Sequence, residues 1–207
     1  MKYYLFFIFL LLLFTEFNFG QKYPSNSPYI AFFAGDLSIH SQKFAEFYET
    51  QNDLVYGISF GIPVSNTITL DASASYFKKS SEYSLEPESE FLNSAIIKQL
   101  IFNTGLQINL MPNRIIGLSF LGGFNYALID EEKKDHEGIV ISDVEDWGNL
   151  GIYLGADFEL SLGKGPVAIF GDAKYTYSWN PVLDYDETYR DLKYTAGLKL
   201  YLKKRWR

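Results

Sequence analysis

The chain of 207 residues contains no cysteine, which excludes disulfides, thiolate metal sites, cysteine nucleophiles and a lipid-modified N-terminal cysteine. Histidine is scarce, since only His40 and His136 occur. Basic residues number 18 against 25 acidic ones, and the net charge of -7 leaves no basic surface for nucleic acid. Hydrophobic residues make up 47% and aromatic residues 18% of the chain, so a folded domain is expected rather than a disordered one.

The first twenty residues are typical of an export signal. Lys2 supplies a positive start, and the residues from Tyr3 to Phe14 form an unbroken apolar run. This run is shorter than the roughly 20 residues that a membrane-spanning helix needs. We therefore predict a cleaved signal peptide over residues 1–20 and one domain over residues 21–207 that works outside the cytoplasm. A retained N-terminal anchor helix is the alternative.

Downstream of Gln21, apolar residues alternate with small or polar ones, which is the pattern of strands with two different faces. One face of the segment 54–62 carries Leu54, Tyr56, Ile58, Phe60 and Ile62. Seven further segments continue the pattern, at 29–40, 68–76, 99–110, 116–128, 150–162, 167–179 and 192–202. We predict eight strands, most of them about ten to thirteen residues long, which is longer than ordinary soluble strands and long enough to cross a bilayer.

The connections between the predicted strands alternate in length. Short segments with turn-forming residues lie at 63–66, 111–114 and 163–166, whereas long polar segments lie at 41–53, 79–92, 130–146 and 180–191. This alternation predicts an all-β fold, an eight-stranded antiparallel up-and-down transmembrane β-barrel. Its short turns would be periplasmic, its long loops extracellular, and both mature termini periplasmic.

Two kinds of barrel share this pattern: a soluble, lipocalin-like barrel with an apolar interior and a membrane barrel with an apolar exterior. The less apolar face is rich in Gly, Ser, Thr and Ala and has few charges, which suits the narrow interior of eight strands. A water-facing surface would carry more Lys and Glu. Aromatic residues near the strand ends, such as Tyr76, Tyr126 and Trp179, would form interfacial girdles. We therefore predict that the apolar face meets lipid in the outer membrane.

In this pattern of strands and connections, residues 21–207 resemble the small outer-membrane β-barrel family of diderm bacteria, the OmpA-transmembrane-like and OmpW-like porin-fold group. The signal ending Phe19-Gly20-Gln21 is similar to that of exported proteins of Bacteroidetes. The resemblance implies outer-membrane lipid and lipopolysaccharide as surroundings. It also implies the barrel-assembly machinery and periplasmic chaperones as partners during biogenesis.

Charged residues on the less apolar face are the candidate site. We predict that they point inward as a lumen polar network formed by Asp36, Asp71, Asp157, Glu159, Asp172, Lys174, Lys193 and Lys199. Because unpaired charge is costly inside a barrel, these groups are expected to form ion pairs and hydrogen bonds that plug the lumen. A gated ion path or a proton relay is the functional alternative.

Other chemistry has weaker support. His40-Ser41 is the candidate for a lipid A-modifying enzyme, but no orienting acid stands at a recognisable spacing. The acidic segment 130–137 lacks the regular ligand spacing of a calcium loop. We therefore predict no catalytic residue, no cofactor and no metal.

The expected function is a structural or surface-binding role through the extracellular loops. The partner would be an unidentified surface ligand or envelope complex, and no enzymatic activity is expected. A narrow OmpW-like channel for small solutes is the first alternative, and a lipid A-modifying enzyme is the second.

Overall fold

The computed structural model describes residues 27–40, 44, 48, 52–83, 93–111, 115–162, 165–181 and 188–202, with the backbone alone at 143–147, 180–181 and 188–189. The predicted signal peptide at 1–20, Ser41, and the C-terminal residues 203–207 lie outside these ranges. The described part of the chain holds no helix with the length and apolar character needed to span a bilayer.

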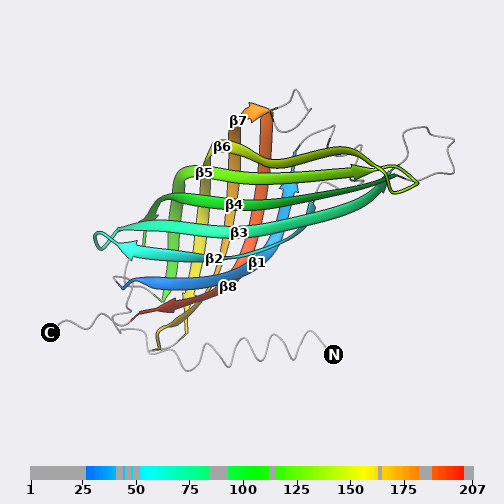
Figure 1. Cartoon of the computed structure of the whole chain (residues 1–207). Helices are drawn as coiled ribbons and strands as arrows, with labels where there is room; N and C mark the ends of the chain where they lie inside the picture. The colour runs from blue at the N-terminus through cyan, green and yellow to red at the C-terminus, as the bar shows by residue number, and fades with distance from the viewer. Residues whose placement is uncertain are drawn as a thin grey trace, which may run out of the picture.

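Eight antiparallel strands close into one barrel, each strand pairing with its neighbours in chain order (Figure 1). They are β1 (Tyr29–Ile39), β2 (Asn52–Pro63), β3 (Ile68–Tyr83), β4 (Asn93–Asn109), β5 (Ile116–Lys134), β6 (Val140–Ser161), β7 (Val167–Pro181) and β8 (Thr188–Tyr201). The barrel is closed by β8, which pairs with β1 along eleven residues from Tyr29 to Ile39. The predicted eight-stranded up-and-down fold is confirmed.

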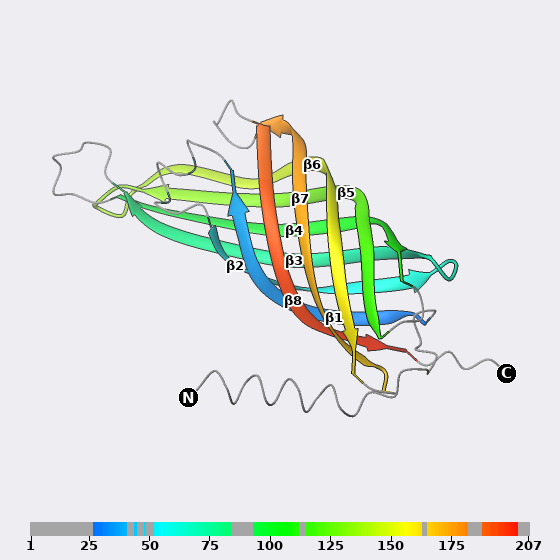
Figure 2. The ribbon, with the colours of Figure 1, turned by 180° about the vertical axis from the view of Figure 1, so that it is seen from behind.

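The strands tilt strongly around the barrel axis, as Figure 2 shows from behind. Paired residues can be followed once around the barrel, from Tyr29 through Gly61, Asp71, Gly105, Gly123, Tyr153, Thr176 and Asp191 to Ile39. The path returns to β1 ten residues further along, since 39 minus 29 is 10. With this stagger, eight strands enclose an interior just wide enough for side chains.

The two ends of the barrel differ. At the turn end, β1 begins, β8 ends and the short connections join β2 to β3, β4 to β5 and β6 to β7. At the opposite end, the loop end, β3 runs six residues past Phe77, the last residue that it pairs with β2. There β5 and β6 extend as a long hairpin beyond the other strands (Figure 1). We call the parts of these four strands beyond the barrel wall the projecting sheet: residues 79–83 of β3, 93–97 of β4, 131–134 of β5 and 140–144 of β6.

The predicted strand lengths are too short for this sheet. Four strands, β3 to β6, have 16 to 22 residues instead of ten to thirteen. The segments 79–92 and 130–146, which were expected to be loops, are in part strands. The two faces no longer differ in this sheet, since Ile96 and Ile97 stand on opposite faces of β4 and Glu131 and Glu132 on opposite faces of β5. The sequence therefore loses its alternation while backbone pairing continues.

The outward face of the barrel wall is a continuous apolar band. On β3 it starts at Ile68 and ends at Tyr76, a nine-residue stretch close to the roughly nine to eleven residues of a bilayer-crossing strand. Large side chains stand far out from the wall, and Leu154 is 67% and Phe124 60% exposed. A band of this size and composition is typical of barrels that face lipid.

Two apolar clusters fill part of the interior. The loop-end cluster consists of Leu37, Ile39, Phe44, Tyr48, Val55, Phe77, Ala95, Ile97, Ile101, Ala127 and Ile129. The turn-end cluster consists of Tyr29, Ala31, Phe33, Ala168, Phe170 and Tyr201. Its Tyr29 ring lies directly over Gly61 on β2, where an added Cβ would overlap the ring. Glycine at position 61 therefore lets this tyrosine reach across the narrow interior.

Candidate functional site

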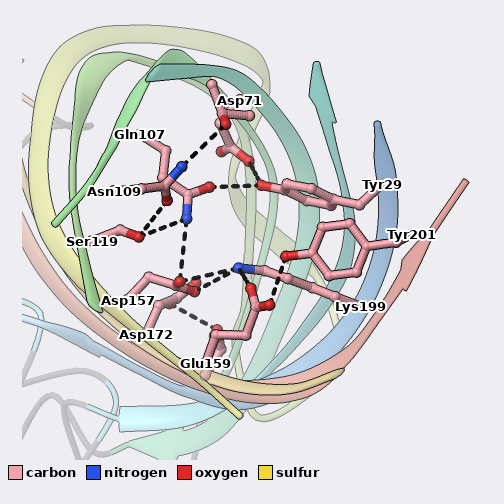
Figure 3. Close-up of polar contacts among 12 residues, drawn as sticks. Tyr29, Asp71, Gln107, Asn109, Ser119, Asp157, Glu159, Asp172, Lys199 and Tyr201 are labelled. Carbon is pink, nitrogen blue, oxygen red and sulfur yellow. Dashed lines mark hydrogen bonds and ion pairs between the residues drawn. The ribbon is translucent and has the colours of Figure 1, made fainter. Parts of the chain in front are cut away.

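The interior polar network centres on Lys199, which β8 points inward near the turn end (Figure 3). Its ammonium lies 3.0 Å from both carboxylate oxygens of Asp157 and 3.0 Å from Oε2 of Glu159. The second Glu159 oxygen accepts a hydrogen bond of 2.6 Å from the Tyr201 hydroxyl. The rings of Tyr29 and Phe170 lie 5.1 Å and 4.9 Å from the ammonium. One lysine thus joins two carboxylates under an aromatic cover.

A hydrogen-bond chain links this centre to the opposite wall. The Tyr29 hydroxyl donates to Oδ2 of Asp71 at 2.7 Å and lies 3.1 Å from Oε1 of Gln107. The Gln107 amide nitrogen donates to Ser119 at 3.0 Å and to Asp157 at 3.3 Å. The chain therefore crosses the barrel from β3 through β1 and β4 to β6, as Figure 3 shows.

A second ionic group lies on β7 and β8. Lys174 forms an ion pair with Asp172 at 3.1 Å, and the Thr195 hydroxyl donates to the same carboxylate at 2.8 Å. Lys193 is the cross-strand partner of Lys174 and is buried as deeply. Its ammonium reaches Ser75 at 3.5 Å and lies 5.6 Å from the centre of the Phe33 ring.

The structure thus buries six of the eight predicted network residues: Asp71, Asp157, Asp172, Lys174, Lys193 and Lys199. Glu159 is half-buried beside Lys199. Asp36 is the exception and requires a correction. It lies on the outward face of β1, in line with the exposed Phe32, and accepts a hydrogen bond of 3.0 Å from Asn52. On β1 the inward positions are apolar, so the assumption that polar residues point inward places Asp36 on the wrong face.

Sequence reasoning missed several members of the network. Tyr201 follows Lys199 by two residues, so extending the alternation of β8 by one step would have found it. Tyr29 gives no such signal, because apolar and aromatic residues occupy both faces of β1. The hydrogen bonds of Gln107 depend on the register of β4, which the sequence does not reveal.

Neutral polar side chains surround Gly151 farther from the turn end. Asn125 and Ser178 flank Gly151 on the neighbouring strands, and Asn149 and Tyr153 stand two residues away from it on β6. Within the described residues, no protein partner meets Oδ1 of Asn125, either amide atom of Asn149, the Tyr153 hydroxyl or the Ser178 hydroxyl. Among the described residues, this part of the interior therefore holds more buried polar atoms than hydrogen-bond partners for them.

Phe44 and Tyr48 close the interior at the loop end. The two residues are helical, stand four positions apart, and their rings stack with centres 4.5 Å apart. Both are at most 2% exposed. The Tyr48 hydroxyl donates to Glu131 on β5 at 2.9 Å, and Lys133 pairs with the same carboxylate group at 3.0 Å. Aromatic rings and an ion pair therefore cap the apolar cluster.

The outer part of the β5–β6 hairpin is charged on its strands and apolar near its tip. Lys134 pairs with Glu132, and this hydrogen bond lowers the pKa of the Glu132 carboxyl. Ile139, Val140 and Ile141 follow each other in sequence and are 59%, 48% and 55% exposed.

Among the described residues, no three His, Asp or Glu side chains gather as a metal site. His40 is exposed at the end of β1.

No protein-family model and no curated protein matches the chain. Solved structures do match. OprG of Pseudomonas aeruginosa, an outer membrane protein, is 15% identical, with a TM-score of 0.54 over 89% of this chain and 99% of its own. Neisserial surface protein A is 13% identical, with a TM-score of 0.49 over 84% of this chain and 97% of its own.

The similar structures also include an outer membrane protease, OmpT of Escherichia coli, at 8% identity and a TM-score of 0.47 over 88% of this chain and 99% of its own. At these identities the likeness concerns the fold alone. The chain is a closed, eight-stranded antiparallel barrel of the kind found in small outer-membrane proteins.

Proposed function

We propose that this chain is an integral outer-membrane barrel, exported by a signal peptide at residues 1–20, with both mature termini periplasmic and a structural or surface-binding role. The observation that carries the proposal is the continuous apolar band around a closed barrel whose interior holds an ionic network near the turn end. In water such a band would be a very large exposed apolar patch, whereas lipid accommodates it.

The interior would be a plug and not a pore. Lys199, Asp157 and Glu159 occupy the turn end with bonds of 3.0 Å, and Phe44 and Tyr48 fill the loop end. An eight-stranded barrel has little space beyond its own side chains. Under this proposal the network stabilises the barrel and no solute passes.

The projecting sheet would carry the surface role. β6 pairs with β7 from Gly151 onward, so its first eleven residues, 140–150, have no partner on the β7 side among the described residues. An unpaired strand edge can accept a strand from another chain. The exposed Ile139, Val140 and Ile141 lie at the start of this edge and would add apolar contact. The partner would be a surface ligand or an envelope complex.

The absence of cysteine gives a direct test of location and orientation. Single cysteines would be placed at the hairpin tip (Glu137→Cys) and, as the matched control, in the β2–β3 turn (Val64→Cys), both exposed positions. In intact cells a membrane-impermeant maleimide should label position 137 alone, and after lysis it should label both. Equal labelling in intact cells, or a chain found in the soluble fraction, would contradict the proposal.

A narrow channel is the second candidate, because apolar side chains line the interior at the loop end. Conductance separates it from the plugged barrel. The proposal includes no enzymatic activity, and a His40→Ala variant should leave the composition of lipid A unchanged. A lipid A change that depends on His40 would instead support an enzyme.

A further inference from the structure

Two lysines stand side by side on the outer surface of the barrel. Lys78 on β3 and Lys98 on β4 are register partners, and both side chains are exposed. Directly opposed side chains in antiparallel strands have Cβ atoms roughly 5 Å apart, so the two ammonium groups can reach one ligand. We call this pair the lysine pair.

The lysine pair marks the upper limit of the apolar band. The next outward residue toward the turn end is Tyr76 on β3 and Leu100 on β4. The Tyr76 ring lies beside that of Tyr56, with centres 5.6 Å apart, as in an interfacial aromatic girdle. Long lysine side chains at this level reach the headgroups while their stems remain against the apolar band.

Neighbouring carboxylates offset the charge of the lysine pair only in part, and on the β5 side alone. Among the described residues, neither ammonium has a carboxylate oxygen within ion-pairing distance. Asp130 is the register partner of Lys98 on its other side. Farther out, Glu132 accepts a hydrogen bond from Lys134, and that bond and the nearby charge of Lys98 both lower the pKa of the Glu132 carboxyl. Like charges directly opposite each other destabilise a sheet unless an anion lies between them.

We propose that Lys78 and Lys98 bind a phosphate group of lipopolysaccharide, the phosphorylated glycolipid of the outer leaflet. The assignment to this leaflet rests on the proposed function, which places the loop end outside. Two ammonium donors on adjacent strands would share one phosphate, and the tyrosines below them would contact the sugar and upper acyl region. The lipid would thereby attach to the wall formed by β3 and β4.

The test measures binding of diphosphoryl lipid A to the folded barrel in non-ionic detergent, with lipid adducts counted by native mass spectrometry. A Lys78→Gln/Lys98→Gln variant should bind at least tenfold more weakly, because it removes both of the cations that attract the phosphate. Lys78→Arg/Lys98→Arg should retain binding. The matched control is Lys134→Gln, which removes a lysine from the same face but outside the pair, and it should bind as the wild type does.

Several results would overturn the proposal. These are undiminished binding by the double glutamine variant, equal binding of dephosphorylated lipid A, equal binding of phosphatidylglycerol, or displacement of lipid A by millimolar inorganic phosphate. Slower gel migration after boiling than before shows that each variant is folded. If lipid A binding fails while position 137 is labelled from outside, only the lysine pair is refuted. If the labelling pattern is inverted, the proposed function fails, and the outer-leaflet assignment fails with it.

Discussion

Single side chains decide whether charge inside this barrel is tolerated. Lys199 is 2% exposed and is the ion-pair partner of both Asp157 and Glu159. Without it, two neighbouring carboxylates would remain in a confined interior with no cation between them. Removing one partner of a buried ion pair destabilises far more strongly than the pair itself stabilises.

We therefore expect Lys199→Met to lower the free energy of unfolding by about 3–5 kcal/mol. Urea titration of the barrel in detergent micelles, followed by tryptophan fluorescence and by gel migration of unboiled samples, would measure the change. Lys134→Met, which removes an exposed partner of Glu132, serves as the control and should leave the midpoint unaltered. Equal midpoints for both variants would show that Lys199 has no special role.

Buried neutral amides give a second expectation at this scale. Asn149 is fully buried, has no partner for its amide group among the described residues, and is the register partner of Ala127 in the loop-end cluster. Asn149→Leu should leave stability unchanged or raise it, because it removes an unpaired polar group and extends the apolar cluster.

Asn103→Leu is the matched comparison. Asn103 accepts a hydrogen bond of 2.8 Å from Asn125 and donates one of 3.3 Å to Ser73. Its loss leaves the Asn125 donor unpaired, so stability should fall by about 1–3 kcal/mol. The same urea titration compares the two variants, and a larger loss for Asn149→Leu would contradict this account.

At the scale of strands and hairpins, the outer end of the β5–β6 hairpin is separable from the barrel. On β5, Glu131 accepts a hydrogen bond from Tyr48 and pairs with Lys133, and both residues lie before the outer part of the hairpin. Residues beyond this point pair only within the projecting sheet.

Deleting residues 134–141 and joining Lys133 to its register partner Ser142 through an Asn-Gly turn should therefore leave the barrel folded. The unboiled protein should keep its faster gel migration and its unfolding midpoint. The apolar tip at Ile139 to Ile141 would be lost, so binding of a surface partner should be lost with it. A shortened chain that no longer migrates as a folded barrel would mean that the hairpin is part of the folding unit.

The sequence predicted the barrel wall well, because each membrane-crossing strand needs one apolar and one small or polar face. It failed at β1, where Phe33 and Leu37 point inward and make both faces apolar, so Asp36 was assigned to the wrong side. It failed again in the projecting sheet, where alternation is lost. Phe44 and Tyr48 were not foreseen, since their burial depends on Glu131, which lies 83 residues after Tyr48.

The candidate site was predictable in composition but not in pairing. Alternation identifies Asp157, Glu159 and Lys199 as inward residues. It does not show that they meet, because β6 and β8 are separated by β7 and approach only across the interior. The ten-residue stagger, which requires all eight registers, determines which charges come together.

For the whole molecule, the interior is filled by different chemistry at its two ends. The charged and hydrogen-bonded side chains around Lys199 occupy the turn end together with the turn-end cluster, whereas apolar side chains with Phe44 and Tyr48 occupy the loop end. Phe44→Ala/Tyr48→Ala should therefore not open a path by itself, since the network around Lys199 remains. Discrete conductance steps from this double variant in a planar bilayer would show that the loop-end residues are the sole barrier.

The central claim is that the folded barrel is closed. The most direct measurement is the conductance of the unheated, purified wild-type barrel in a planar bilayer, with its folded state shown by gel migration. We predict no discrete conductance steps. Reproducible steps from the folded protein would contradict the plug and favour the narrow channel, with the charges around Lys199 lining its path.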